Sequence, residues 1–85
     1  YADALNNLGN ALRSLKRPKE ALACYSRALA LAPGHAEANN NMGEILKEQG
    51  RLDEASDFIG KAIALRPAYA AAHNNMGILL QARNR

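Results

Sequence analysis

Apolar residues recur along this chain at the spacing of amphipathic α-helices. In the first stretch, Leu5, Leu8, Leu12 and Leu15 follow one another at steps of three, four and three. Because an α-helix turns once in about 3.6 residues, this spacing places the four side chains on one face. Comparable stripes follow through the rest of the chain. The pattern predicts five helices, over Ala2–Leu15, Pro18–Ala32, Ala36–Gln49, Asp53–Arg66 and Ala70–Arg83.

Glycine and proline residues mark the turns between these helices. Gly50 can adopt a positive φ and end one helix, and Asp53 then places a negative charge at the positive N-terminus of the next. Pro18 has the fixed φ that suits a first helical turn. Pro33 and Pro67 follow the second and fourth helices and end them. The predicted turns are therefore short.

The sequence also repeats itself at a fixed offset. The interval from Gly9 to Gly43 recurs from Gly43 to Gly77, and it also separates Pro33 from Pro67. A fixed period of this size is the signature of a repeat architecture, in which each repeat is one small structural unit. We expect one domain over residues 1–85, with repeats at 2–35 and 36–69 and a partial third repeat at 70–85.

Composition agrees with an all-α fold. Among the 85 residues are 18 alanines and 12 leucines, whereas valine, threonine and tryptophan are absent. Helix formers thus dominate and strand formers are scarce. No apolar run approaches the roughly 18 residues of a membrane span, so we expect no membrane partner. The chain begins at Tyr1 with no basic-then-apolar leader, and we therefore expect a cytoplasmic protein.

Catalytic and metal-binding chemistry finds no support in the sequence. Cys24 is the single cysteine, so neither an internal disulfide nor a paired-cysteine metal site can form. His35 and His73 lie far apart in the sequence, and neither has a second ligand one helical turn away. Glu44 and Glu48 share a helix face, but a lysine interleaves with them, which indicates a solvated face. We expect no catalytic residues, no cofactor and no metal.

The net charge of +3 suggests nucleic-acid binding, but the distribution of charge does not support it. The only basic cluster is Arg13, Lys16, Arg17 and Lys19, around a predicted turn. Recognition of RNA would also need stacking residues along a groove. The aromatic residues Tyr1, Tyr25, Phe58 and Tyr69 fall instead on loops or second helices. An RNA-binding helical repeat is therefore a third alternative, and we expect no nucleic-acid partner.

The chain resembles the tetratricopeptide repeat family. Each member repeat is a 34-residue helix-turn-helix with the spacing W-x2-L-G-x2-Y, A-x3-F and P. The pattern falls on Leu5, Leu8, Gly9, Leu12, Ala21, Tyr25 and Pro33, on Asn39, Met42, Gly43, Leu46, Ala55, Ile59 and Pro67, and on His73, Met76, Gly77 and Leu80. The chain departs from it at the tryptophan position and at Lys16, where members usually carry glycine. The resemblance implies about two and a half repeats stacked in a short right-handed superhelix, with a concave and a convex side. The repeated glycines would let paired helices approach closely.

Nine asparagines stand out, because asparagine is a mediocre helix former. Six of them form pairs at the repeat spacing: Asn6-Asn7, Asn40-Asn41 and Asn74-Asn75. An amide side chain can both donate to and accept from the backbone of an extended peptide. The second asparagine of each pair has an equally good structural interpretation, as a link between helices. In the family, the exposed face of the first helices lines the concave groove, which here gives the candidate peptide-binding residues Asn6, Asn7, Asn10, Arg13, Asn40, Asn41, Glu44, Lys47, Asn74, Asn75 and Ile78.

Two closer resemblances refine the functional hypothesis. Chaperone-binding members hold a C-terminal carboxylate at five positions, which fall here on Asn6, Asn10, Asn41, Ala71 and Asn75. Only the second and third match and the three cations are missing, so we do not expect binding of a chaperone tail. The asparagine ladder is similar to the repeat arm of O-linked N-acetylglucosamine transferases. We expect a non-catalytic module that binds a protein or peptide, or alternatively the substrate-recruiting arm of a larger enzyme such as a glycosyltransferase.

The last predicted helix carries apolar residues where a capping helix would be polar. Its candidate self-association residues are Met76, Ile78, Leu79 and Leu80. Ile78 is notable because Asn10 and Glu44 hold the equivalent positions in the other repeats. A large apolar patch is rare on a soluble monomer, so we expect a homo-oligomer formed through this helix.

Overall fold

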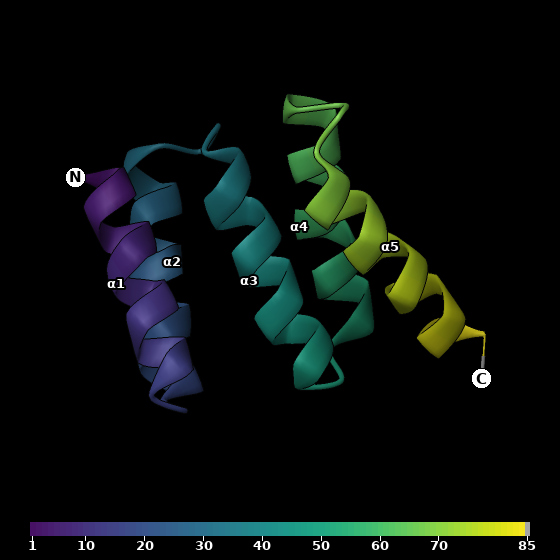
Figure 1. Ribbon diagram of the computed structural model, residues 1–85, viewed down its shortest axis with the longest axis horizontal. Helices are drawn as coiled ribbons and strands as arrows, with labels where there is room; N and C mark the ends of the chain where they lie inside the picture. The colour runs from purple at the N-terminus through teal and green to yellow at the C-terminus, as the bar shows by residue number, and fades with distance from the viewer. Residues whose placement is uncertain (85) are drawn as a thin grey trace.

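A computed structural model describes residues 1–84, which fold into five α-helices joined by short turns (Figure 1). The helices are α1 (Ala2–Ser14), α2 (Pro18–Leu31), α3 (Ala36–Glu48), α4 (Leu52–Leu65) and α5 (Ala70–Arg83). These residues contain no strand, and the all-α prediction is confirmed. Every predicted helix is present, with ends within one residue of the predicted ends.

The helices form two layers. Helix α1 pairs with α2 and α3 pairs with α4, so each full repeat is a helix-turn-helix, and α5 packs against α4. In Figure 1 the helices α1, α3 and α5 lie in front, with α2 behind α1 and α4 behind α5. We call α1, α3 and α5 the first-helix layer. This layer presents one side of every repeat on a single surface.

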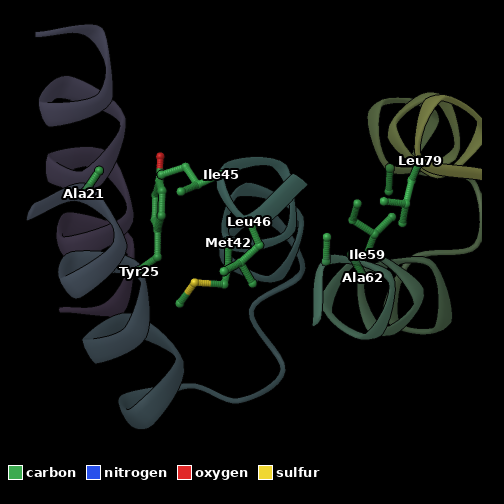
Figure 2. Packing of buried hydrophobic residues seen from close by; sticks show 10 residues of the cluster. Ala21, Tyr25, Met42, Ile45, Leu46, Ile59, Ala62 and Leu79 are labelled. Carbon is green, nitrogen blue, oxygen red and sulfur yellow. The ribbon is translucent and has the colours of Figure 1, made fainter. Parts of the chain in front are cut away.

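The hydrophobic core lies both between the two helices of a repeat and between neighbouring repeats, as one continuous cluster. Its largest fully buried apolar side chains are Tyr25, Ile45, Leu46, Ile59 and Leu79. Figure 2 shows Tyr25 of α2 pointing toward Ile45 of α3, and Ile59 of α4 facing Leu79 of α5. Full burial of one such side chain contributes about 1.5–3 kcal/mol. Each helix pair is therefore stabilised by the next element along the chain.

Glycine allows close helix contact in two of the three repeats. A side chain at Gly9 would collide with the ring of Tyr25, and one at Gly43 would collide with Ile59 and lie 3.1 Å from the backbone oxygen of Ala55. The predicted close approach is wrong for Gly77, where an added Cβ would meet nothing within 4 Å. The physical reason is that no helix of the described residues covers this side of α5.

The turns inside the two full repeats have the same backbone conformation despite different sequences. Lys16 has φ 61° and Gly50 has φ 79°, and both lie in the left-handed region. In each case the next backbone N–H, from Arg17 or Arg51, donates to a carbonyl five residues earlier at 2.9 Å. A lysine adopts this conformation at a steric cost that glycine avoids. Lys16 therefore forms the same turn as Gly50 in the second repeat.

Polar side chains contact the backbone of the loops between repeats. They stand at the position where the repeat pattern has tryptophan. Asn39 Nδ2 donates to the carbonyl oxygens of Pro33 at 3.2 Å and His35 at 3.0 Å. One repeat later, His73 Nε2 lies 2.7 Å from the carbonyl oxygen of Pro67. These side-chain contacts tie each loop to the first helix that follows it, and the carbonyl of His35 also accepts from the backbone N–H of Asn39.

One residue assigned to the self-association surface is buried instead. Leu79 is 0% exposed and belongs to the core that α5 shares with α4, so its expected place on the surface is wrong. The reason is its helical position: it lies on the face of α5 that packs on the previous repeat. Ile78 and Leu80 are exposed as expected, at 46% and 49%, and Met76 is half-buried. Within residues 1–84, no helix is long and apolar enough to cross a membrane.

Candidate functional site

Side-chain hydrogen bonds join α1 to α3 across the first-helix layer. Asn41 Nδ2 donates to Asn6 Oδ1 at 3.0 Å and to Asn10 Oδ1 at 3.1 Å. We call this pair of bonds the first rung. Asn6 is 1% exposed, so its oxygen depends on the rung for a hydrogen-bond donor. The hydroxyl of Tyr25, from α2, donates to the same oxygen of Asn10. Burial raises the pKa of Tyr25, which keeps this donor protonated.

A second rung joins α3 to α5 with the same geometry. Asn75 Nδ2 donates to Asn40 Oδ1 at 3.0 Å and to Glu44 Oε2 at 2.9 Å. All three residues lie one full repeat after their equivalents in the first rung. Asn40 and Asn75 are 3% and 6% exposed, so the second rung is also buried. The two rungs therefore connect successive repeats through matched polar contacts.

The ladder ends at both sides of the molecule. Asn7 is equivalent to the donors Asn41 and Asn75, and Asn74 is equivalent to the buried acceptors, yet both are exposed. Neither has a neighbouring repeat against it within residues 1–84. Ile78 stands where the ladder would have its second acceptor and offers no oxygen or nitrogen in its side chain. The polar pattern thus stops on α5.

An ion-pair cluster lies beside the rungs. The guanidinium of Arg13 on α1 contacts Glu44, and its Nη2 also lies 3.0 Å from Glu48 Oε2, both on α3. Lys47 Nζ donates to Asn75 Oδ1 at 3.4 Å. Both cations that were predicted to line the groove therefore contact neighbouring side chains, which leaves them less available to an anionic ligand.

Glu44 connects the rung and the ion pair. Burial by itself raises the pKa of this carboxyl, but hydrogen bonds from Arg13 and Asn75, together with the positive charges of Arg13 and Lys47, outweigh it. The net result is a pKa below the usual value for glutamate, so the carboxylate stays ionised at neutral pH. Glu44 is accordingly a charged acceptor that takes part in both the second rung and the ion pair.

Most of the predicted groove residues come together in this network. Its members from the prediction are Asn6, Asn10, Arg13, Asn40, Asn41, Glu44, Lys47 and Asn75. Asn7, Asn74 and Ile78 stay exposed outside it. Sequence reasoning missed Tyr25 and Glu48 as members. A signal for Glu48 was available, because it lies four residues after Glu44 on the same helix face.

The exposed groups of the first-helix layer include Asn10 on α1 and Glu48 on α3, and both Asn74 and Ile78 on α5. A pocket of about 400 Å³ opens beside Asn10, Arg13 and Ser14. Glu48 of α3, which pairs with Arg13, is exposed, and so is Ile78 of α5. Among residues 1–84, no cluster of three His, Cys, Asp or Glu side chains could hold a metal ion. The chemistry offered to a ligand is therefore hydrogen bonding, charge and apolar contact.

Comparison with known proteins agrees with the repeat pattern. The family model described as tetratricopeptide repeat matches residues 1–68. The chain belongs to the tetratricopeptide repeat family. Its helix-turn-helix repeats thus form the short right-handed superhelix that the sequence predicted. No curated protein sequence matches the chain closely enough to add to this assignment.

Solved structures share the fold over almost the whole chain. The second tetratricopeptide domain of Spaghetti (RPAP3) bound to the HSP90 peptide SRMEEVD has a TM-score of 0.93 at 22% identity, covering 98% of this chain and 77% of that one. Two structures of the MamA protein have TM-scores of 0.91 at 25% identity, and the matches cover 98% of this chain but only 45% and 48% of theirs. The family and the shared fold support a protein-interaction module in general.

Proposed function

We propose that this tetratricopeptide domain is a non-catalytic binding module that takes an extended peptide or a partner helix on its first-helix layer. The observation that carries the proposal is the pair of buried rungs, which fix α1, α3 and α5 relative to one another. A surface held in this way is preorganised, so a ligand does not have to order it on binding. The partners in this proposal are peptides or proteins.

Some hydrogen-bonding groups remain available at the two ends of the ladder. Asn7 and Asn74 are exposed, and both have an amide that can donate to and accept from a peptide backbone. The amides of Asn6, Asn40 and Asn75 are buried and engaged. We therefore assign ligand contact to the exposed asparagines, to Asn10 and Ile78 beside them, and only indirectly to the buried ones.

The acidic peptide that the Spaghetti domain binds is a poor candidate for this chain. Of the clamp positions, Asn6, Ala71 and Asn75 replace the cations that hold the carboxylates in chaperone-binding members. Of the two groove cations, Arg13 is already paired with two glutamates, and Lys47 donates to Asn75. An acidic tail would therefore lose hydration without gaining a strong ion pair.

A substrate-recruiting arm of a larger enzyme stays the alternative, because the same binding surface would serve it. An RNA-binding role has less support. Within α1, α3 and α5 there is no tyrosine, phenylalanine or tryptophan on which a base could stack. Tyr25 is fully buried behind the layer.

The test is selection of seven-residue peptides from a random display library on the 85-residue chain. A selected peptide should bind the wild type, and Asn10→Ala or Ile78→Asp should each weaken binding by about 5-fold or more, since one bond or apolar contact is lost. Titration calorimetry measures the change. SRMEEVD is the comparison peptide and should bind no more tightly than its scrambled sequence.

Lys61→Ala provides the matched control, because Lys61 is exposed on α4, outside the first-helix layer. Its affinity for the selected peptide should equal that of the wild type. Selected peptides that are indifferent to both layer substitutions, or that lose affinity equally with Lys61→Ala, would refute the proposed surface. Tight binding of SRMEEVD would refute the argument about the missing cations.

A further inference from the structure

One cation of the first-helix layer has two carboxylates as partners within the chain. Nη2 of Arg13 on α1 lies 3.0 Å from Oε2 of Glu48 and also contacts Oε1 of Glu44, both on α3. Burial by itself lowers the pKa of Arg13, but hydrogen bonds to the two glutamates outweigh burial and raise that pKa above the usual value. One positive and two negative charges meet here, so the cluster keeps an excess of negative charge.

The two glutamates hold Arg13 in different ways. Oε2 of Glu44 accepts from Asn75 Nδ2 at 2.9 Å in the second rung, which leaves Oε1 for the arginine. The side chain of Glu44 is 27% exposed, whereas that of Glu48 is 55% exposed. Glu44 is therefore a partner whose position is fixed by the rung, and Glu48 is a partner that faces solvent.

The second repeat shows the same cation position without acidic partners. Lys47 is the equivalent of Arg13, but Ile78 and Ala82 on α5 stand where α3 has the two glutamates. Lys47 Nζ donates instead to the uncharged Oδ1 of Asn75, at 3.4 Å. A hydrogen bond to a neutral oxygen is weaker than one to a carboxylate. The strong pairing of Arg13 therefore depends on the two glutamates and does not follow from the repeat fold alone.

Arg13 also lines the pocket of about 400 Å³ that opens beside Asn10 and Ser14. The oxygen of the Asn10 side chain already accepts from Tyr25 and Asn41, so its amide offers N–H donors to a ligand. Ser14 adds a hydroxyl, which can also donate. Donors of this kind around an unpaired arginine would suit a carboxylate. With Arg13 paired to two glutamates, the pocket offers hydrogen bonds but no available positive charge.

We propose that Glu44 and Glu48 determine the specificity of this surface, because they occupy Arg13 and so exclude a ligand carboxylate from the pocket. This role rests on the proposed peptide binding, and it sets the class of ligand: a peptide that is neutral or basic where it crosses α1 and α3. An acidic side chain entering the pocket would have to displace a partner of Arg13 and would then lie beside excess negative charge. A neutral or basic side chain avoids both effects.

Parallel selections from one random peptide library, on the wild type and on the Glu44→Gln/Glu48→Gln variant, test the proposal. Glutamine keeps an oxygen that can accept from Asn75, so the second rung remains while both charges are removed. Peptides selected on the double variant should contain more Asp and Glu than those selected on the wild type. By titration calorimetry, an acidic peptide from that selection should bind the double variant about 5-fold or more tightly than the wild type. Adding Arg13→Gln should abolish this difference.

Glu20→Gln/Glu54→Gln is the matched control. These glutamates lie on α2 and α4, outside the first-helix layer, and each pairs with an arginine three residues earlier, at 2.7 Å and 2.8 Å. The control therefore removes the same charge and also releases two arginines, but its selected peptides should match those of the wild type in Asp and Glu content. Glu48→Gln alone leaves the rung untouched and should give a smaller gain for the acidic peptide. Circular dichroism checks that every variant keeps its helicity.

Three results would each overturn the specificity role: equal Asp and Glu content in the selections on the wild type and the double variant, an equal gain in the control, or a gain that survives Arg13→Gln. Failure of the proposed function has a different signature. Peptides selected on the wild type would then bind regardless of Asn10→Ala and Ile78→Asp, whatever charge they carry.

Discussion

Glycine at one repeat position has opposite consequences in neighbouring repeats. Gly43 faces Ile59 and the backbone of α4, so an added methyl group has no room there. Gly77 occupies the same position in the next repeat but faces open space. In open space a helical glycine only lowers stability, because its unfolded backbone has more freedom to lose. The effect of glycine on stability therefore depends on which atoms face it.

We predict that Gly43→Ala destabilises the fold by about 1–3 kcal/mol, because it overpacks a close helix contact. Gly77→Ala should instead stabilise it by up to about 1 kcal/mol through helix propensity. Urea unfolding at low protein concentration measures the free energy of unfolding of both variants. Equal effects of the two substitutions would show that α5 is covered in the same way as α3.

Hydrogen bonds of the two rungs join α1 to α3 and α3 to α5, in addition to apolar packing. Each rung places one amide nitrogen between two oxygen acceptors, at least one of which belongs to a buried residue. A buried polar group of this kind destabilises the fold when its partner is lost. When all partners are present, the network favours a single arrangement of the helices. The rungs thus set the register between first helices, while the core residues behind them provide most of the burial.

Asn41→Ala and Asn75→Ala should each destabilise the domain by about 1–3 kcal/mol, because Asn6 or Asn40 would keep a buried oxygen without its donor. Asn74→Ala is the control, since this asparagine is exposed on the same helix as Asn75. It should change the free energy of unfolding by less than about 0.5 kcal/mol. Thermal unfolding measures these changes. An Asn41→Ala variant as stable as the wild type would show that the rungs do not stabilise the fold.

At the scale of the whole molecule, charge is distributed unevenly. The chain has a net charge of +3, yet α3 at the centre of the first-helix layer carries three glutamates and one lysine. Arg13 of α1 is held by two of these glutamates, which links the first repeat to the second. Both glutamates are partly exposed, so solvent and salt screen part of this attraction.

The lowered pKa of Glu44 predicts how stability changes with pH. A carboxyl whose pKa is lower in the folded than in the unfolded state adds stability above the unfolded value, about 4.3, and loses it as the pH falls through the folded value. Glu44→Gln should therefore flatten the loss of stability in acid. Urea midpoints from pH 7 down to pH 3 measure the slope, and identical slopes for both proteins would contradict the assignment.

The amino-acid sequence by itself determined the local structure and the repeat. Helix ends follow from the apolar spacing and from residues such as Pro18 and Gly50, which act on their immediate neighbours. The fixed repeat offset likewise identified the asparagines that form equivalent positions. Both kinds of information are local or periodic, and for this reason they could be read without coordinates.

Only the tertiary structure decided which equivalent residues are buried. Asn40 and Asn74 share a repeat position, but the first is covered by α5 and the second is exposed. Leu79 was expected on the surface and lies in the core, because α4 covers its face of α5. Periodicity treats every repeat as the same, whereas burial depends on whether a neighbouring repeat is present. Equivalent residues therefore differ in burial according to which helices pack against them in residues 1–84.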